Sequence, residues 1–369
     1  MRIHQLGLIS LLSFVSPLVC GQQLQIVTSG PHNTLGLVLG ATFNEKDNEF
    51  FIQDVSFQTT SGGQTVKRTI SAWNLSNEET KGIPRIDEYS TTSSKYTCGR
   101  IEFVPGLHVV VACSRGSSLE FLDSISLALR NKIEVGQLGT IFDFAIDEDL
   151  NVLLVLSVSS DERIHLSSYS LKEGLQRSDL VLGSSYAVNN ISIAVSPSAK
   201  VVAIATTRPE KGKSILYSCT YGKEIGCRDL GNGPPISQLA FLGRQLLFAP
   251  SSFPDDKRAC IISVNLSTDA RAKAYCAPQT GVHYAVGVIE ERYIVGYTGL
   301  RTTNWLTENA RVAESSFSLW RPANKQVQTK VSDPTKGKGF QAFHVVGSKS
   351  IPYFIAFSPS SEFTLYQIQ

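Results

Sequence analysis

Short runs of apolar residues alternate along the chain with polar or Gly/Pro-containing turns, and this alternation repeats. A first apolar run, a turn and a second apolar run recur seven times, with starts roughly 42 to 64 residues apart. The seven units cover residues 35–55, 99–113, 141–158, 191–206, 236–250, 283–298 and 341–357. Because short apolar, β-branched runs bounded by turn residues are typical of strands, each unit predicts a β-hairpin.

A third strand is predicted after every hairpin and a weaker fourth strand after six of them. The third strands are expected at 69–75, 118–124, 164–171, 214–220, 260–266, 316–322 and 363–368, and the fourth at 85–90, 132–137, 179–184, 227–232, 273–278 and 328–333. The seventh unit ends at Gln369 without a fourth strand of its own, and residues 24–30 can supply it. The pattern therefore predicts an all-β ring of seven four-stranded sheets, closed by both ends of the chain.

Composition agrees with a large all-β core. The 369 residues are 42% hydrophobic and 18% charged, which excludes a globally disordered chain. A net charge of +2 argues against electrostatic nucleic-acid binding.

Residues within the repeats resemble a known superfamily. Ser196-Pro197-Ser198-Ala199-Lys200-Val201-Val202 looks like the turn between the first two strands of YVTN and WD-repeat proteins. Trp73 and Trp320 stand where a WD repeat carries its tryptophan, although Asn74 and Arg321 replace the aspartate. The resemblance implies a seven-bladed β-propeller over residues 22–369, with the tryptophans packed between blades. It is a superfamily pattern and implies no particular ligand.

The N-terminus reads as a secretory signal peptide over residues 1–21. Arg2 supplies a positive charge, an apolar stretch follows, and Val19-Cys20-Gly21 offers a cleavage site before Gln22. A membrane anchor and a lipoprotein acylated at Cys20 are the alternatives, but the apolar run is short for a span and Val19 is bulky for lipoprotein processing. We therefore expect a secreted protein, periplasmic in a bacterium, with no membrane span in the mature chain.

Six cysteines remain after cleavage, and an even number in an exported chain favours disulfides. Each sequence-neighbouring pair is centred on a turn, so it can face its partner across one hairpin. The expected pairs are Cys98–Cys113, Cys219–Cys227 and Cys260–Cys276. Zinc is the alternative, but CxxC spacing is absent and no histidine stands at ligand spacing beside a cysteine.

Long loops between second and third strands are the candidate binding surface. On the resemblance to propellers, these loops share one face, which we call the upper face, with the connections between blades. The longer ones are 59–67, 251–258 and 299–315. An exposed tryptophan flanked by arginines is typical of an interface hot spot, although Trp305 could instead fold inward as an anchor. The candidate binding residues are Phe253, Asp255, Asp256, Arg301, Trp305 and Arg311.

Three histidines are the candidate catalytic residues. His32 and His283 precede or begin first strands and His344 lies in another, so all three can converge at the upper mouth of the channel and act as acid, base or metal ligand. His108 and His165 belong to other strands and look structural. The chain has no G-x-S-x-G, H-E-x-x-H or P-loop motif. A lactonase and muconate-cyclising family of secreted propellers is the enzymatic rival, but its His, Arg and Glu constellation matches no specific positions here.

Two further surface features remain open. Asp147, Glu148 and Asp149 form an acidic turn that suits either solvent or calcium. The sequons beginning at Asn74, Asn190 and Asn265 are glycosylation sites if the source is eukaryotic, and otherwise chance occurrences. Used sequons would leave the upper face of blades 5, 6, 7 and 1 open.

The sequence therefore favours a monomeric secreted binding module for an extracellular protein or glycan, without cofactor, metal or catalysis. The alternative is a lactonase or other hydrolase acting at the channel mouth.

Overall fold

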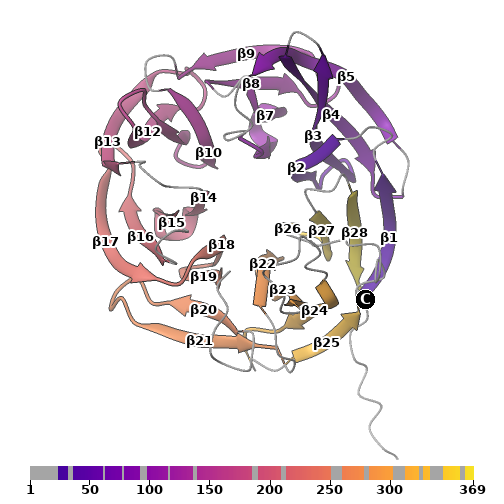
Figure 1. The fold of residues 1–369 in the computed structure, drawn as a ribbon, viewed down its shortest axis with the longest axis vertical. Helices are drawn as coiled ribbons and strands as arrows, with labels where there is room; N and C mark the ends of the chain where they lie inside the picture. Colours follow the sequence, from indigo (N-terminus) through magenta and orange to yellow (C-terminus); the bar gives the residue numbers. More distant parts are fainter. Residues whose placement is uncertain are drawn as a thin grey trace, which may run out of the picture.

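A computed structural model of the chain shows seven antiparallel sheets arranged around a central opening (Figure 1). It describes residues 24–31, 36–60, 63–76, 79–91, 98–114, 117–135, 139–184, 190–208, 213–250, 260–277, 282–301, 312–323, 327–332, 344–357 and 362–369. Each sheet has four strands, which confirms the seven-bladed propeller predicted from the repeats. The finer likeness to YVTN and WD repeats stays a prediction.

Within each blade the strands run from the centre of the ring outward. Blade 1 holds β2 (Gly36–Asn44), β3 (Glu49–Thr60), β4 (Gly63–Asn74) and β5 (Glu79–Thr91). Blade 2 holds β6 (Ile101–Val104), β7 (Val109–Ser114), β8 (Ser118–Asp123) and β9 (Leu129–Glu134). Blade 3 holds β10 (Thr140–Asp147), β11 (Val152–Val158), β12 (Arg163–Ser170) and β13 (Gln176–Ser184). Blade 4 holds β14 (Asn190–Ser196), β15 (Val201–Arg208), β16 (Lys213–Thr220) and β17 (Gly226–Gly233).

The remaining blades continue the same order. Blade 5 holds β18 (Ile236–Leu242), β19 (Gln245–Pro250), β20 (Cys260–Val264) and β21 (Arg271–Cys276). Blade 6 holds β22 (Val282–Ile289), β23 (Tyr293–Arg301), β24 (Val312–Trp320) and β25 (Val327–Ser332). Blade 7 holds β26 (His344–Gly347), β27 (Tyr353–Phe357), β28 (Glu362–Ile368) and, outermost, β1 (Leu24–Pro31). Single 3-10 turns, Pro105–Leu107 and Pro197–Ala199, join the first two strands of blades 2 and 4.

The N-terminal strand closes the ring. β1 pairs antiparallel with β28, from Leu24 opposite Ile368 to Pro31 opposite Glu362 (Figure 1). This confirms the predicted closure, in which the first described residues complete the last blade. It also leaves no unpaired edge on β28, where exposed strand edges favour aggregation.

The core consists of seven apolar clusters, each between two neighbouring blades, within the described part of the chain. The second strand of blade 3 shows why the sequence reads as it does. Leu153 and Val155 pack toward blade 2, whereas Leu154 and Leu156 pack toward blade 4. Because successive side chains point to opposite faces and both faces are buried, the strand is apolar without alternation.

The tryptophans lie between blades, as the resemblance implied. Trp320 in blade 6 is fully buried, and its ring centroid is 6.0 Å from that of Tyr275 in blade 5. Trp73 in blade 1 packs edge-on against Phe363 in blade 7, with centroids 5.4 Å apart. Both therefore join neighbouring sheets.

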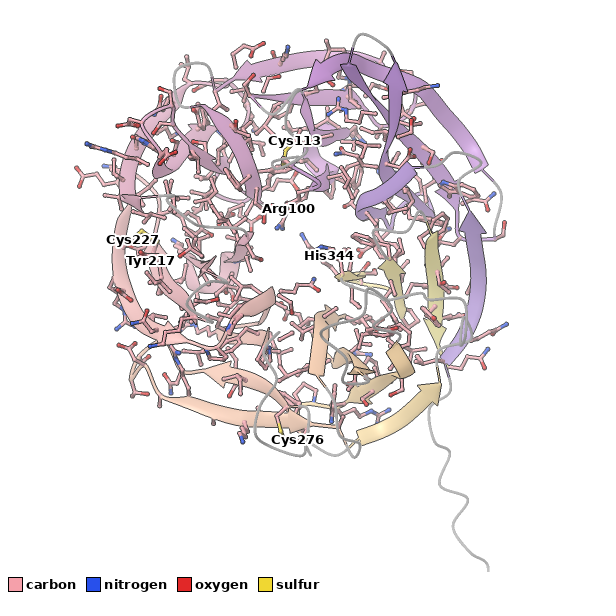
Figure 2. All side chains as sticks on the ribbon, in the orientation of Figure 1. Arg100, Cys113, Tyr217, Cys227, Cys276 and His344 are labelled. Atoms are coloured by element: carbon pink, nitrogen blue, oxygen red, sulfur yellow. A yellow bond between two sulfur atoms is a disulfide. The ribbon has the colours of Figure 1, made fainter. Side chains whose placement is uncertain are left out.

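The three predicted disulfides are present, with Cα separations of 5.8 Å for Cys98–Cys113 and 4.0 Å for each of the other two. In blades 4 and 5 the cysteines face each other across the outer two strands (Figure 2). The prediction that Cys98 lies directly opposite Cys113 on paired strands is wrong. Val104 pairs with Val109, so the residue opposite Cys113 is Arg100, and Cys98 lies just before β6.

Two of the expected upper-face loops are shorter than predicted because the strands extend into them. In blade 1 the pairing of β3 and β4 continues to Thr60 opposite Gly63, so most of 59–67 is sheet. In blade 6 Arg301 pairs with Val312, so the connection spans only 302–311. The described residues contain no helix long and apolar enough to cross a membrane.

Candidate functional site

The innermost strands of the seven blades present one residue each at the same level of the channel. The register fixes this level. In blades 1 to 6 the last residue of the inner strand pairs with the first residue of the next strand, and in blade 7 the corresponding pair is Ser348 and Tyr353, joined by a backbone hydrogen bond just beyond β26. Counting four residues back from that pair gives one equivalent position per blade. We call this set the inner ring: Gly40, Arg100, Asp143, Ser192, Gln238, Ala285 and His344.

Five of the seven inner-ring residues are polar, in strands that are otherwise largely apolar. The turns between first and second strands lie on the face that we call lower, so the inner ring lies toward the opposite, upper end of the channel. β6 begins directly after Arg100, and β26 begins at His344. Figure 2 shows Arg100 and His344 at the central opening, approaching it from different sides.

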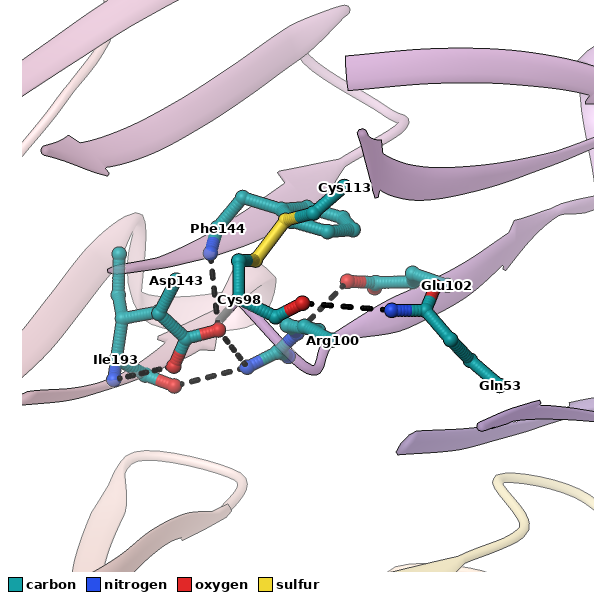
Figure 3. The surroundings of a disulfide bond; sticks show 8 residues. All are labelled: Gln53, Cys98, Arg100, Glu102, Cys113, Asp143, Phe144 and Ile193. Carbon is teal, nitrogen blue, oxygen red and sulfur yellow. Dashed lines mark hydrogen bonds and ion pairs between the residues drawn. A yellow bond between two sulfur atoms is a disulfide. The ribbon is translucent and has the colours of Figure 1, made fainter. Parts of the chain in front are cut away.

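Arg100 connects three blades around the upper channel (Figure 3). Its Nη1 lies 3.7 Å from Asp143 Oδ1 and donates a 3.0 Å hydrogen bond to the carbonyl oxygen of Ile193, and its Nε lies 3.4 Å from Glu102 Oε2. Asp143 Oδ2 accepts a 3.1 Å hydrogen bond from the backbone N–H of Ile193. Blades 2, 3 and 4 are therefore joined by one cation and two carboxylates.

Burial sets the ionisation of this group. Removal from water raises the pKa of Asp143 to about 6, even though Arg100 and the hydrogen bonds from Ile193 and Phe144 act in the opposite direction. Burial by itself lowers the pKa of Arg100, but the adjacent carboxylates of Asp143 and Glu102 raise it by more, so the pKa lies above its ordinary value. The guanidinium therefore stays charged, while the charge of Asp143 changes in mildly acidic solution. About 31% of the Arg100 side chain remains exposed.

Gln238 forms the corresponding connection on the other side of the channel. Its Nε2 donates a 2.8 Å hydrogen bond to the carbonyl oxygen of Val345 in blade 7. Its Oε1 accepts from the backbone N–H groups of Val345, at 3.2 Å, and Val286 in blade 6, at 3.3 Å. One neutral side chain thus joins blades 5, 6 and 7 without introducing a charge.

His344 is the predicted histidine whose environment the structure describes. Its ring stacks on Phe357 with centroids 5.3 Å apart, and the residue is exposed to the channel. Partial removal of the imidazole from water disfavours its charged form and lowers the pKa of His344 to about 4, so the ring is neutral near pH 7.

Most other predicted site residues lie outside the described part of the chain. These are His32, Phe253, Asp255, Asp256, Trp305 and Arg311, together with the whole predicted signal peptide, 1–21. His283 is in β22 opposite Thr298, and Arg301 ends β23, but their side chains are not described. The predicted convergence of three histidines therefore stays a prediction, and so does the hot spot around Trp305.

The acidic turn of blade 3 is built into the fold rather than fully solvated. Asp147 is buried, and its carboxylate accepts a 2.7 Å hydrogen bond from the Tyr221 hydroxyl of blade 4. Glu148 accepts a hydrogen bond from the backbone N–H of Gly106 in blade 2. The two carboxylates therefore point to different neighbours. Within the described residues no group of three His, Cys, Asp or Glu side chains could hold a metal ion.

The remaining histidines and sequons are placed as follows. His108 is exposed in the inner turn of blade 2, and His165 is buried with its Nδ1 2.9 Å from Asp179 Oδ2. Asn74 and Asn265 both fall at the turn between third and fourth strands, on the lower face as predicted. Asn190 begins β14 at the upper face, and its side chain is not described.

Sequence reasoning missed Arg100, Asp143 and Gln238. A usable signal existed, because each is a polar residue at the same offset before the inner turn of its repeat. The register had to be known before the three could be aligned. Comparison with known proteins adds no further residue: no protein-family model matches the chain, and no curated protein matches it significantly.

Proposed function

We propose that the protein is a secreted binding module that holds an extracellular protein or glycan at its upper face and performs no chemistry of its own. The inner ring carries this proposal. It places partly exposed Arg100 and exposed His344 at the upper end of the channel, on a scaffold held rigid by Arg100, Asp143 and Gln238. Binding sites commonly combine a rigid framework with a few convergent polar groups and overlying loops.

The expected loop residues would complete this surface. Arg301 ends a strand at the upper face, directly before the segment that contains Trp305 and Arg311. A tryptophan and arginines over a polar mouth combine a large apolar contact with oriented hydrogen-bond donors. Secretion supports the same proposal, because the three disulfides suit an oxidising compartment.

A direct test uses arrays of extracellular glycans and of displayed extracellular protein domains, probed with the mature chain. For any ligand found, Arg301→Ala combined with Trp305→Ala should weaken binding at least ~10-fold, as expected for hot-spot truncation. Lys172→Ala, at an exposed lower-face turn, is the matched control and should leave binding unchanged. Unchanged binding in the double variant, or equal loss in the control, would contradict the proposal.

A hydrolase acting at the channel mouth is the second candidate. One observation favours it: His344, Arg100 and two carboxylates occupy the upper end of the same channel. Against it, Arg100 is held by Asp143 and by a backbone carbonyl, and a histidine of pKa about 4 is a weak base at neutral pH. Turnover of a panel of lactones, abolished in His344→Ala, would support this candidate, and no turnover above buffer would remove it.

A further inference from the structure

A groove lies on the lower face where blades 1 and 7 meet. Its volume is about 370 Å³, within the range of small-ligand sites. Blade 1 and blade 7 both contribute to its lining, which consists of Asp47, Asn48, Asn74, Leu75, Ser76, Ile351 and Tyr353. The groove therefore crosses the seam at which the ring closes.

The groove is lined by both apolar and polar residues. Leu75 and Tyr353 pack on the apolar cluster between blades 1 and 7, so their outer surfaces continue that core. Asp47, Asn48 and Ser76 supply hydrogen-bonding groups around it. A sugar ring matches this combination, because its C–H face packs on aromatic and aliphatic surface while its hydroxyl and amide groups bond at the edge.

Both walls are held in place by hydrogen bonds. On the blade 1 side, the backbone N–H of Leu75 donates a 2.9 Å hydrogen bond to the carbonyl oxygen of Asn48. On the blade 7 side, the Glu45 carboxylate accepts from the backbone N–H groups of Lys349 and Ser350 and from the hydroxyls of Ser348 and Ser350. A ligand would thus enter a preformed groove, at little cost in ordering the protein.

One wall of the groove is itself a sequon. Asn74-Leu75-Ser76 turns back at the end of β4, and Asn74 Oδ1 accepts a 2.8 Å hydrogen bond from the Ser76 hydroxyl. Asn265-Leu266-Ser267 is the same tripeptide at the corresponding turn of blade 5, and there Asn265 is exposed. The surroundings of the two sequons therefore differ. Asn74 lines the groove and is half-buried, whereas Asn265 is exposed.

We propose that Asn74 carries an N-linked glycan whose innermost sugar lies in this groove, against Leu75 and Tyr353, and so bridges blades 1 and 7. In the transfer, Asn74 Nδ2 forms a bond to the anomeric carbon of a lipid-pyrophosphate-linked oligosaccharide. The bond from that carbon to the phosphate oxygen breaks, the lipid pyrophosphate leaves, and the amide loses one proton. The proposal rests on the secretory export proposed above, but not on any upper-face ligand.

The test expresses the full chain in a eukaryotic secretory host and maps the occupied sites by peptide mass spectrometry. A peptide N-glycosidase, which cleaves the bond between the innermost sugar and the asparagine, is then used to release the glycan. The rate of release at Asn74 is measured in the native protein and after denaturation. We expect native release to be at least ~10-fold slower at Asn74, because the enzyme must reach a sugar packed on protein. Where Asn265 is occupied, its native and denatured rates should be similar.

A second measurement examines the bridge. Trimming the glycans with an endoglycosidase that leaves one sugar on each asparagine should not change the melting temperature. Ser76→Ala, which cannot be glycosylated at Asn74, should lower the melting temperature by ~2 °C or more. Ser76→Thr keeps the sequon and should restore both the glycan and the melting temperature. Ser267→Ala is the matched control and should not lower it.

Three results would overturn the proposal: Asn74 unoccupied, native release at Asn74 as fast as after denaturation, or equal melting temperatures with and without its innermost sugar. None of these readouts involves ligand binding, so failure here and failure of the proposed function remain distinguishable.

Discussion

Removing the carboxylate of Asp143 should change how stability depends on pH. In the unfolded chain this carboxyl has a pKa near 3.8, and burial beside Arg100 raises it to about 6 in the folded protein. Folding therefore favours the protonated form. The stability associated with this form is fully present below pH 4 and is lost as the pH rises through about 6. The pKa difference corresponds to ~3 kcal/mol.

The assay is guanidinium unfolding of wild type and Asp143→Asn at constant ionic strength from pH 4 to pH 8. The free energy of unfolding of wild type minus that of the variant should fall by up to ~3 kcal/mol across this range. Taking the difference matters because His344 acts in the opposite direction. Its pKa is lowered from 6.5 to about 4, so its contribution is lost as the pH falls through that range.

Gln176→Ala, at an exposed position of blade 3 that carries no titratable group, is the control and should give a difference that does not vary with pH. A flat difference for Asp143→Asn would refute the reasoning, because the carboxyl would then titrate alike in both states. A difference that grows with pH would refute it too, since Arg100 would then outweigh burial.

The remaining predictions concern packing and closure. Gly40→Ala should destabilise the protein by several kcal/mol, because an added Cβ would collide with the backbone carbonyl oxygen of Gly99. Gly226→Ala would meet only ordinary contacts and should cost about 1 kcal/mol or less. Chemical denaturation of the two variants makes the comparison. Trp320→Ala should cost ~3–5 kcal/mol by the same measurement, and a loss below 1 kcal/mol would contradict its role between blades 5 and 6. Deleting residues 22–31 should expose the edge of β28 and give aggregation in size-exclusion chromatography; a monomeric, equally stable product would show that closure by β1 is dispensable.

The repeat was predictable because every blade has the same order of strands and buries its strands against neighbouring blades in the same way. A second strand such as Val152–Val158 is buried on both faces, so its apolar run is conspicuous. The closing strand was predictable for a related reason, since the last repeat lacked a partner that residues 24–30 could supply. The registers of the Cys219–Cys227 and Cys260–Cys276 pairs were also predicted correctly, because in each the two strands follow one another across a turn.

The site was harder to predict because it depends on contacts between repeats. Arg100 binds the backbone of Ile193, 93 positions away, and Gln238 binds that of Val345, 107 positions away. No local pattern encodes such pairs. The Cys98 register failed for a local reason: the 3-10 turn at Pro105–Leu107, followed by His108 in a left-handed conformation, shifts the pairing by two residues.

The pairing of β1 with β28 has a mechanical consequence. Leu24 and Ile368 are neighbours at one end of the same antiparallel pair, so a load applied between the two ends of the described chain pulls at that end of the ladder. Its backbone hydrogen bonds would then break one after another, as in a zipper, and not all together as in shear. The three disulfides each lie inside a single blade and do not span this junction. A tether attached at both ends would therefore open blade 7 first and leave the other six sheets folded under modest tension.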